Sequence, residues 1–209
     1  DENNSLYHND GNGKFSRVLS GAIVNDGGNS LGASWADYDN DGDLDLYVTN
    51  ASFQKNFLYD NNGDGTFTRN TSALPANENG HSFGSAWGDI DNDGDLDLYV
   101  TNDNGNANRL YMSNGDGTFY VQEQLVLNED TENSTSTSFA DYDNDGDLDI
   151  FVTNNQYQAN TLYNNGNGSC NSFKCFKLQG TNSNRSGIGA KVRVKATIYG
   201  QEIWQMREI

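Results

Sequence analysis

The chain has 209 residues, of which 34% are hydrophobic, 23 are glycine and only one is proline. Its formal charge is −18, and no stretch approaches the 18 or more apolar residues of a membrane-spanning helix, so we expect no membrane span. A body this acidic repels phosphate backbones, which argues against nucleic acid as a partner and favours metal cations.

The charge is unevenly distributed along the chain. Residues 1–169 contain 28 acidic and 5 basic side chains, whereas residues 170–209 contain 2 acidic and 7 basic ones. The sequence starts at Asp1 without an initiator methionine or an apolar leader, so we expect a processed or trimmed piece of a soluble protein. The two regions are therefore treated as an acidic body and a basic tail.

A repeat organises the acidic body. Three segments align without a gap and start 52 residues apart: Trp35–Asn50, Trp87–Asn102 and Phe139–Asn154. A second element keeps the same spacing at Leu6-Tyr7, Leu58-Tyr59, Leu110-Tyr111 and Leu162-Tyr163. Such a period predicts structural units that bury their apolar faces against one another.

In chain order, we expect a half-unit near residues 5–18 and further units near 31–70, 83–122 and 137–169. Within a unit, the run Asp45–Thr49 alternates polar and apolar side chains as a half-buried strand does, and the turn Gly63-Asp64-Gly65 indicates a hairpin. About four short strands per unit predict an all-β, propeller-like array of about three and a half four-stranded blades. Trp35, Trp87 and Phe139 share one repeat position and are expected to pack between blades.

Each full repeat contains the loop Asp-x-Asp-Asn-Asp-Gly-Asp-Leu-Asp. Its acidic residues are the candidate metal ligands: Asp37, Asp39, Asp41, Asp43, Asp45, Asp89, Asp91, Asp93, Asp95, Asp97, Asp141, Asp143, Asp145, Asp147 and Asp149. Two carboxylates about 5 Å apart repel by roughly 3 kcal/mol at an effective dielectric constant near 20, so such a loop needs a counter-ion.

The spacing favours Ca²⁺. Carboxylates at loop positions 1, 3, 5 and 9, a glycine at 6 and a main-chain carbonyl at 7 supply the six to eight oxygens that this ion prefers. The carbonyls of Asp43, Asp95 and Asp147 are the expected ligands at position 7. Mg²⁺ is a weaker fit because it keeps its waters, and an EF-hand would carry an acidic residue at position 12, where this chain has valine. We expect three separate calcium sites.

The loops, with the Leu-Asp-Leu-Tyr-Val-Thr-Asn strand and the Asn-Gly-Asp-Gly-Thr-Phe turns, resemble the FG-GAP or VCBS repeat over residues 5 to about 169. The stretch Ser183–Val194 resembles the domain of ASPIC and UnbV proteins, so residues 170–209 are identified as a small, incomplete β segment of that kind. The resemblance implies calcium at loop positions 1, 3, 5, 7 and 9, an extracellular or cell-surface location, and binding or adhesion.

Other candidate sites are few. His8 and His81 are the only histidines and lie near no plausible nucleophile, so we expect no enzyme activity. Cys170 and Cys175 are expected to form a disulfide, with free thiols or a bridge between chains as alternatives. Glycosylation sequons occur at Asn3, Asn50, Asn70, Asn133, Asn167 and Asn184.

These features predict a non-catalytic, extracellular, calcium-binding structural or interaction module. The alternatives are a receptor-like propeller that binds a glycan or protein through its variable connections, and a secreted polysaccharide-processing enzyme. The chain has three calcium hairpins but four Leu-Tyr hairpins, which leaves closure of the propeller within one chain in doubt. We therefore expect open strand edges at residues 1–18 and at predicted strands near Phe173–Leu178 and Lys191–Ile198. A basic tail on the next acidic body would give a heterologous head-to-tail ring or filament, unless further sequence completes the propeller.

Overall fold

The computed structural model describes residues 2–122, 127, 130–166, 191–198 and 201–208. Nearly all regular structure among them is antiparallel β-sheet. The strands are β1 (Tyr7–Gly11), β2 (Lys14–Arg17), β3 (Ser30–Ala36), β4 (Asp45–Asn50), β5 (Phe57–Asn61), β6 (Phe67–Asn70), β7 (Ser82–Gly88), β8 (Asp97–Asn102), β9 (Arg109–Ser113), β10 (Phe119–Val121), β11 (Ser134–Ala140), β12 (Asp149–Asn154), β13 (Thr161–Tyr163), β14 (Lys191–Ile198) and β15 (Gln201–Glu208). Two short 3₁₀ turns, η1 (Ala22–Val24) and η2 (Leu74–Ala76), precede β3 and β7.

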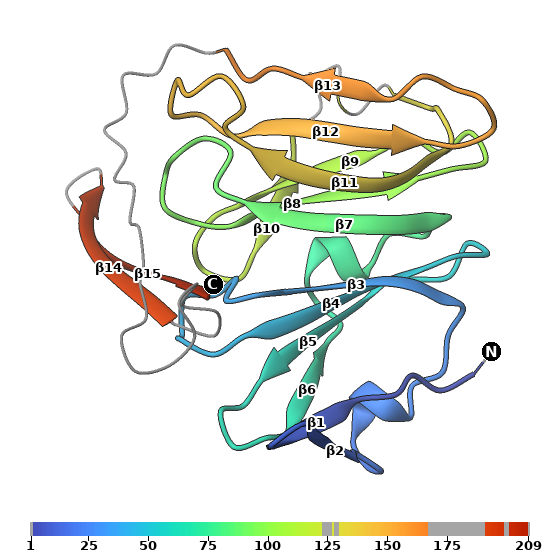
Figure 1. Cartoon of the computed structure of the whole chain (residues 1–209), viewed down its shortest axis with the longest axis vertical. Coiled ribbons are helices and arrows are strands. Elements are labelled where there is room, and N and C mark those ends of the chain that lie inside the picture. Colours follow the sequence, from blue (N-terminus) through green and yellow to red (C-terminus); the bar gives the residue numbers. More distant parts are fainter. Residues whose placement is uncertain (1, 123–126, 128–129, 167–190, 199–200, 209) are drawn as a thin grey trace.

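The sheets follow the repeat. The order β3-β4-β5-β6 forms the first blade, β7-β8-β9-β10 the second, and β11-β12-β13 the third, while β1 and β2 form a hairpin of their own. Figure 1 shows the three blades stacked along the molecule with β7 between β3 and β11, which contact it from either side. The predicted propeller-like array is therefore confirmed, with β3, β7 and β11 as the inner strands.

Close approach of the inner strands depends on glycine at a repeat position. A Cβ atom on Gly32 would lie 2.5 Å from the carbonyl oxygen of Phe83, and one on Gly84 would lie 2.9 Å from that of Thr135. The Thr49 hydroxyl also donates across the same gap to the Phe83 carbonyl at 2.7 Å. Neighbouring blades can pack this tightly only where no side chain intervenes.

The core formed by the described residues consists of three apolar clusters. One lies between the first and second blades and includes Tyr38, Tyr47, Leu58 and Leu98. The second and third blades enclose another, and the remaining cluster covers the outer side of the first blade under η1. Apolar residues therefore face neighbouring blades on both sides of each sheet, as expected for stacked repeat units.

The third sheet differs from the first two. Its inner strand begins at Ser134, three residues before the expected residue 137, and its described part has three strands rather than four. The predicted strand near Phe173–Leu178 lies outside the described residues. The predicted strand at Lys191–Ile198 is confirmed as β14.

The basic tail supplies a two-stranded sheet, β14-β15, in which Lys191 pairs with Glu208 and Ile198 with Gln201. The guanidinium of Arg193 donates to the main-chain oxygen of Gly42 at 3.3 Å, so this hairpin lies beside the first aspartate loop. Figure 1 shows it at the side of the stack, near the loop that joins β3 to β4. No helix among the described residues is long and apolar enough to cross a membrane.

Candidate metal sites

The three aspartate loops lie at equivalent places in the fold. They connect β3 to β4, β7 to β8, and β11 to β12, which are the inner two strands of each blade. Because β3, β7 and β11 are neighbours, the loops follow one another along one edge of the stack. The repeat thus places three copies of the same acidic loop in a row.

Backbone geometry explains the turn shape that recurs in the three loops. Asn40, Asn92 and Asn144 at position 4 have φ of 60°, 58° and 64°, a left-handed conformation that asparagine tolerates better than most residues. The glycines at position 6 have φ near 100° (98°, 105° and 97°), where a side chain would be strained. The N–H of that glycine donates to the first aspartate at 3.2 Å in every loop. The first carboxylate is thereby held toward the loop interior.

The ninth aspartate is the deepest residue of each loop. Asp45 accepts from the N–H groups of Tyr38 (3.3 Å) and Asn61 (2.8 Å), so it ties the loop to the outer hairpin of its own blade. Asp97 and Asp149 make the same pair of bonds in the second and third blades. All three are buried, at 1–2% exposure. These carboxylates are therefore almost wholly removed from solvent.

The electrostatics of the loops favour a cation. Burial is the main cause that raises the pKa of Asp45 to about 8 and that of Asp97 to about 8, with neighbouring aspartates adding to it. The pKa values of Asp39 and Asp91 are also raised, again mainly by burial and then by the next aspartate along the loop. A bound cation would offset both causes by compensating the negative charge.

Carboxylate oxygens converge in each loop. Ligand atoms within 4.8 Å of one another come from Asp37, Asp39 and Asp41 in the first loop, from Asp89, Asp91 and Asp97 in the second, and from Asp141, Asp143 and Asp149 in the third. The donor set is all oxygen, as Ca²⁺ requires, and the residues present fit that ion. The structure therefore brings the carboxylates at positions 1 and 3 together in every loop. The third carboxylate of the cluster comes from position 5 in the first loop and from position 9 in the second and third loops.

The seventh aspartate has a role that spacing alone did not predict. The amide of Asn40 donates to the carboxylate of Asp95 at 2.9 Å, and Asn92 donates in the same way to Asp147 at 2.7 Å. Position 4 of one loop is thus bonded to position 7 of the next. Since these side chains are engaged between blades, the main-chain oxygen remains the group that position 7 would offer a metal. The expected separate sites are joined by hydrogen bonds.

Replacing Asn92 with glycine, which keeps the left-handed backbone but removes the amide, should weaken calcium binding at the third loop by about ten-fold or more, because a hydrogen bond to a carboxylate contributes about 1.5–3 kcal/mol. Asn144→Gly is the matched control, since within the described chain no further loop follows it. Calorimetric titration at low protein concentration should show one weakened site in Asn92→Gly. Identical titrations of the two variants would contradict the link between loops.

The raised pKa values predict how pH acts on the calcium-free protein. A carboxyl whose folded pKa is about 8 instead of 3.8 stays protonated in the folded state while it ionises in the unfolded one. Stability of calcium-free protein therefore falls as pH rises from about 4 to 8. With calcium bound, protons compete with the ion, so the difference in melting temperature between loaded and stripped protein should shrink steadily from pH 8 to pH 5. A difference that is constant over this range would refute the assignment.

Other sequence-predicted residues have varied surroundings. Asn50 is fully buried and its amide donates to the Lys55 carbonyl at 2.8 Å, so the folded chain presents no accessible sequon there. Asn3 is exposed, Asn133 is partly buried, and Asn70 is partly buried with its amide 3.0 Å from the Tyr38 hydroxyl. Cys170, Cys175, Asn167 and Asn184 lie outside the described residues.

His81 is not the isolated surface residue that its position in a connection suggests. Its Nδ1 lies 2.6 Å from a carboxylate oxygen of Asp103, and its ring packs 5.5 Å from that of Phe83. His8 is exposed and pairs with Asp10 in the β1–β2 hairpin. The two histidines therefore lie in different parts of the fold.

Residues outside the loops complete each site, and sequence analysis missed them. The N–H groups of Asn61, Ser113 and Asn165 reach the ninth aspartates from the outer hairpins. These three residues are 52 positions apart, so the repeat alignment marks them as equivalent, but their side-chain types differ. The contact is made by the backbone, which carries no sequence signal.

Comparison with known proteins agrees with this architecture. A sequence profile of the FG-GAP-like repeat matches residues 1–48, 44–100 and 89–152. None of the curated proteins compared with the chain matches it. The profile matches end at residue 152, so the resemblance of residues 170–209 to ASPIC and UnbV proteins stays a prediction. Since the three matches together cover well over half of the 209 residues, the chain belongs to the FG-GAP-like repeat family.

Proposed function

We propose that this chain is a non-catalytic, extracellular interaction module whose blades are locked by three calcium ions. The observation that supports the proposal most directly is the threefold recurrence of converging carboxylates along one edge of the stack. Asp37, Asp89 and Asp141 would bind the ion at position 1 of each loop, where the glycine N–H of the turn already orients their carboxylates. A bound Ca²⁺ would neutralise the repelling carboxylates and fix the connection between the inner strands.

The hydrogen bonds between loops extend this effect along the stack. The Asn40–Asp95 and Asn92–Asp147 bonds connect neighbouring loops, so fixing one loop also restricts the next. Calcium would then stabilise the packing of neighbouring blades as well as each loop. Extracellular calcium is abundant enough to fill sites with dissociation constants of about 10⁻⁴–10⁻³ M, which suits a secreted or cell-surface location.

Calorimetric titration of calcium-stripped protein tests the proposal, with an expected stoichiometry of three ions per chain. Asp41→Ala should lower the stoichiometry to two or leave one site far weaker, because it removes a ligand at position 5. Asp64→Ala is the matched control, since Asp64 is an exposed aspartate in the turn after β5, outside the loops. An absence of calcium binding, or equal titrations of the two variants, would refute the proposal. Substitution of Mg²⁺ in the same titration decides between the two ions.

A second candidate, binding of a glycan or protein by the variable connections, is favoured by two aromatic residues. Phe53 and Tyr157 occupy the same repeat position in the β4–β5 and β12–β13 connections, with exposures of 60% and 108%. Their φ values of 59° and 63° are rare for bulky side chains, and such strain concentrates at functional sites. A glycan array with the double variant Phe53→Ala/Tyr157→Ala as control tests this candidate, and equal signals from both proteins would sink it.

A further inference from the structure

The basic tail contacts the acidic body at the first aspartate loop. The guanidinium of Arg193, in β14, donates to the main-chain oxygen of Gly42 at 3.3 Å. A Cβ atom on Gly42 would lie 2.7 Å from Nη2 and 3.4 Å from Cζ of this arginine, so the guanidinium lies directly against the turn. Figure 1 shows the β14–β15 hairpin, here termed the tail hairpin, beside the loop that joins β3 to β4. The contact lies within one chain, whereas charge alone suggested a tail on the body of the next copy.

Gly42 is position 6 of the loop, and both of its main-chain polar groups are engaged. Its N–H donates to Asp37 at 3.2 Å, and its oxygen accepts from Arg193. The peptide unit that carries this oxygen also carries the N–H of Asp43, which donates to the carboxylate of Asp41 at 2.9 Å. Asp41 is one of the converging carboxylates of the first loop. Arg193 is therefore one peptide unit away from a candidate metal ligand.

The charge of Arg193 acts on whatever cation the loop holds. Arginine stays protonated in proteins, so its guanidinium is a permanent positive charge. In the calcium-free loop, this charge offsets part of the repulsion among the carboxylates. In the calcium-loaded loop, the same charge lies beside a divalent cation and is repelled by it. The contact of Arg193 with Gly42 is thus favoured in the first state and disfavoured in the second.

Arg193 also has an opposite, smaller effect on the first loop. Its hydrogen bond to the Gly42 oxygen polarises the peptide unit that holds Asp41, which strengthens the next hydrogen bond by about 10–30% and favours calcium by less than about two-fold. Repulsion of a divalent cation by an exposed unit charge against the loop disfavours binding by roughly three- to ten-fold at low salt. The charge therefore decides the sign.

We propose that Arg193 lowers the calcium affinity of the first loop, and that calcium in this loop in turn loosens the tail hairpin from the body. The two effects are one coupling, because each partner must change the binding of the other by the same factor. The tail hairpin is then a calcium-sensitive contact, held on the loop at low calcium and weakened at high calcium. The inference rests on the proposed function, since it requires calcium in the first loop.

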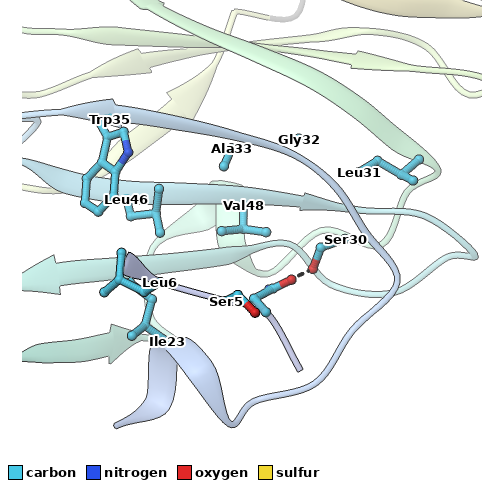
Figure 2. A pocket seen from close by; sticks show the side chains of 11 residues that line it. Ser5, Leu6, Ile23, Ser30, Leu31, Gly32, Ala33, Trp35, Leu46 and Val48 are labelled. Carbon is cyan, nitrogen blue, oxygen red and sulfur yellow. Dashed lines mark hydrogen bonds between the residues drawn. The ribbon is translucent and has the colours of Figure 1, made fainter. Parts of the chain in front are cut away.

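Loss of the Arg193 contact should leave the first blade folded. The side chain is exposed, and its hydrogen bond lies at the turn of the loop. Strand β4, which follows the loop, is held by apolar packing: Figure 2 shows Leu6 and Ile23 across from Leu46, and these residues belong to one cluster. Trp35, at one end of this groove, is 46% exposed, so its predicted packing between blades is not realised within this chain. The N-terminal segment and not the tail hairpin therefore covers this side of the blade.

Two charge-matched variants test the coupling. Arg193→Gln removes the charge at the loop, and Lys195→Gln removes an equal charge two residues further along the same face of β14, where Lys195 pairs with Glu202 at 2.7 Å. Calorimetric titration with calcium at low salt should show one site tightened by about three- to ten-fold in Arg193→Gln, and every site within about two-fold of the unaltered chain in Lys195→Gln. The gain should shrink as salt approaches about 1 M. Equal titrations of the two variants overturn the proposal.

A second substitution identifies the loop on which Arg193 acts. Asp41→Ala removes a ligand of the first loop, and Asp93→Ala removes the equivalent residue of the second. Arg193→Gln should tighten one of the two sites that remain in Asp93→Ala, but should leave the two that remain in Asp41→Ala unchanged. A gain that persists in Asp41→Ala would reveal a general charge effect and overturns the contact at Gly42 as its cause. Melting curves verify that each variant is folded.

Hydrogen exchange of the tail hairpin measures the coupling from the other side. In the unaltered chain, amides of β14 and β15 should exchange up to three- to ten-fold faster in saturating calcium than in chelator, the factor expected from the titration. In Arg193→Gln the rates should not depend on calcium. Exchange that ignores calcium in the unaltered chain overturns the proposal.

The coupling and the proposed function fail separately. Three bound ions, with equal titrations of Arg193→Gln and Lys195→Gln, would overturn the coupling alone. Absence of calcium binding in the unaltered chain and in all variants would overturn the proposed function.

Discussion

Removal of calcium should lower the melting temperature of this protein by roughly 15–30 °C. At free calcium about a hundred times the dissociation constant, each site contributes about 2.7 kcal/mol, or about 8 kcal/mol for three sites. That is comparable with the whole stability of a typical domain, about 5–15 kcal/mol, and each kcal/mol shifts the melting temperature of a chain this size by about 2–4 °C. Thermal unfolding followed by circular dichroism, with and without chelator, measures the change.

The physical reason lies in the loops. Asp45 and Asp97 are held in buried positions by main-chain N–H groups, so the stripped protein must either bury their charge or protonate them. Replacing calcium with excess Mg²⁺ is the control for ionic strength and divalent charge, and should restore only part of the stability. A melting curve that does not respond to chelator would show that the loops are not calcium sites that support the fold.

Leu110→Ala should destabilise the chain by about 2–5 kcal/mol, whereas Leu162→Ala should cost less than about 1 kcal/mol. The two leucines occupy the same repeat position, in the third strand of their blades. Leu110 is 1% exposed in the cluster with Ile150 and Val152, and its truncation leaves a cavity between the second and third blades. Leu162 is half exposed, so truncation there leaves no enclosed cavity. The measurement is denaturant unfolding in calcium. Equal costs for Leu110→Ala and Leu162→Ala would contradict the difference in burial between the two leucines.

The sequence determined the local structure and the chemistry of the loops. Alternation in runs such as Asp45–Thr49 fixed the strands, the period of 52 residues fixed the blades, and glycine and asparagine at loop positions 6 and 4 fixed the turns. These are properties of neighbours in the chain, so a single sequence contains them. The oxygen ligands for a metal followed from the same short segment.

Residues at the same repeat position do not all have the same surroundings, and only the tertiary structure decided which of them do. Trp35 and Trp87 occupy the same repeat position, yet Trp35 is 46% exposed and lines an open groove, whereas Trp87 is partly buried against the core cluster between the first and second blades. Asn50 is part of a sequon, but it is buried by bonds to Ser30 and Lys55 from adjoining segments. The bond from Asn40 to Asp95 likewise spans 55 residues and depends on how two blades pack. Burial and hydrogen bonding between blades depend on distant parts of the chain, and a repeat pattern does not show which of its copies has a neighbour.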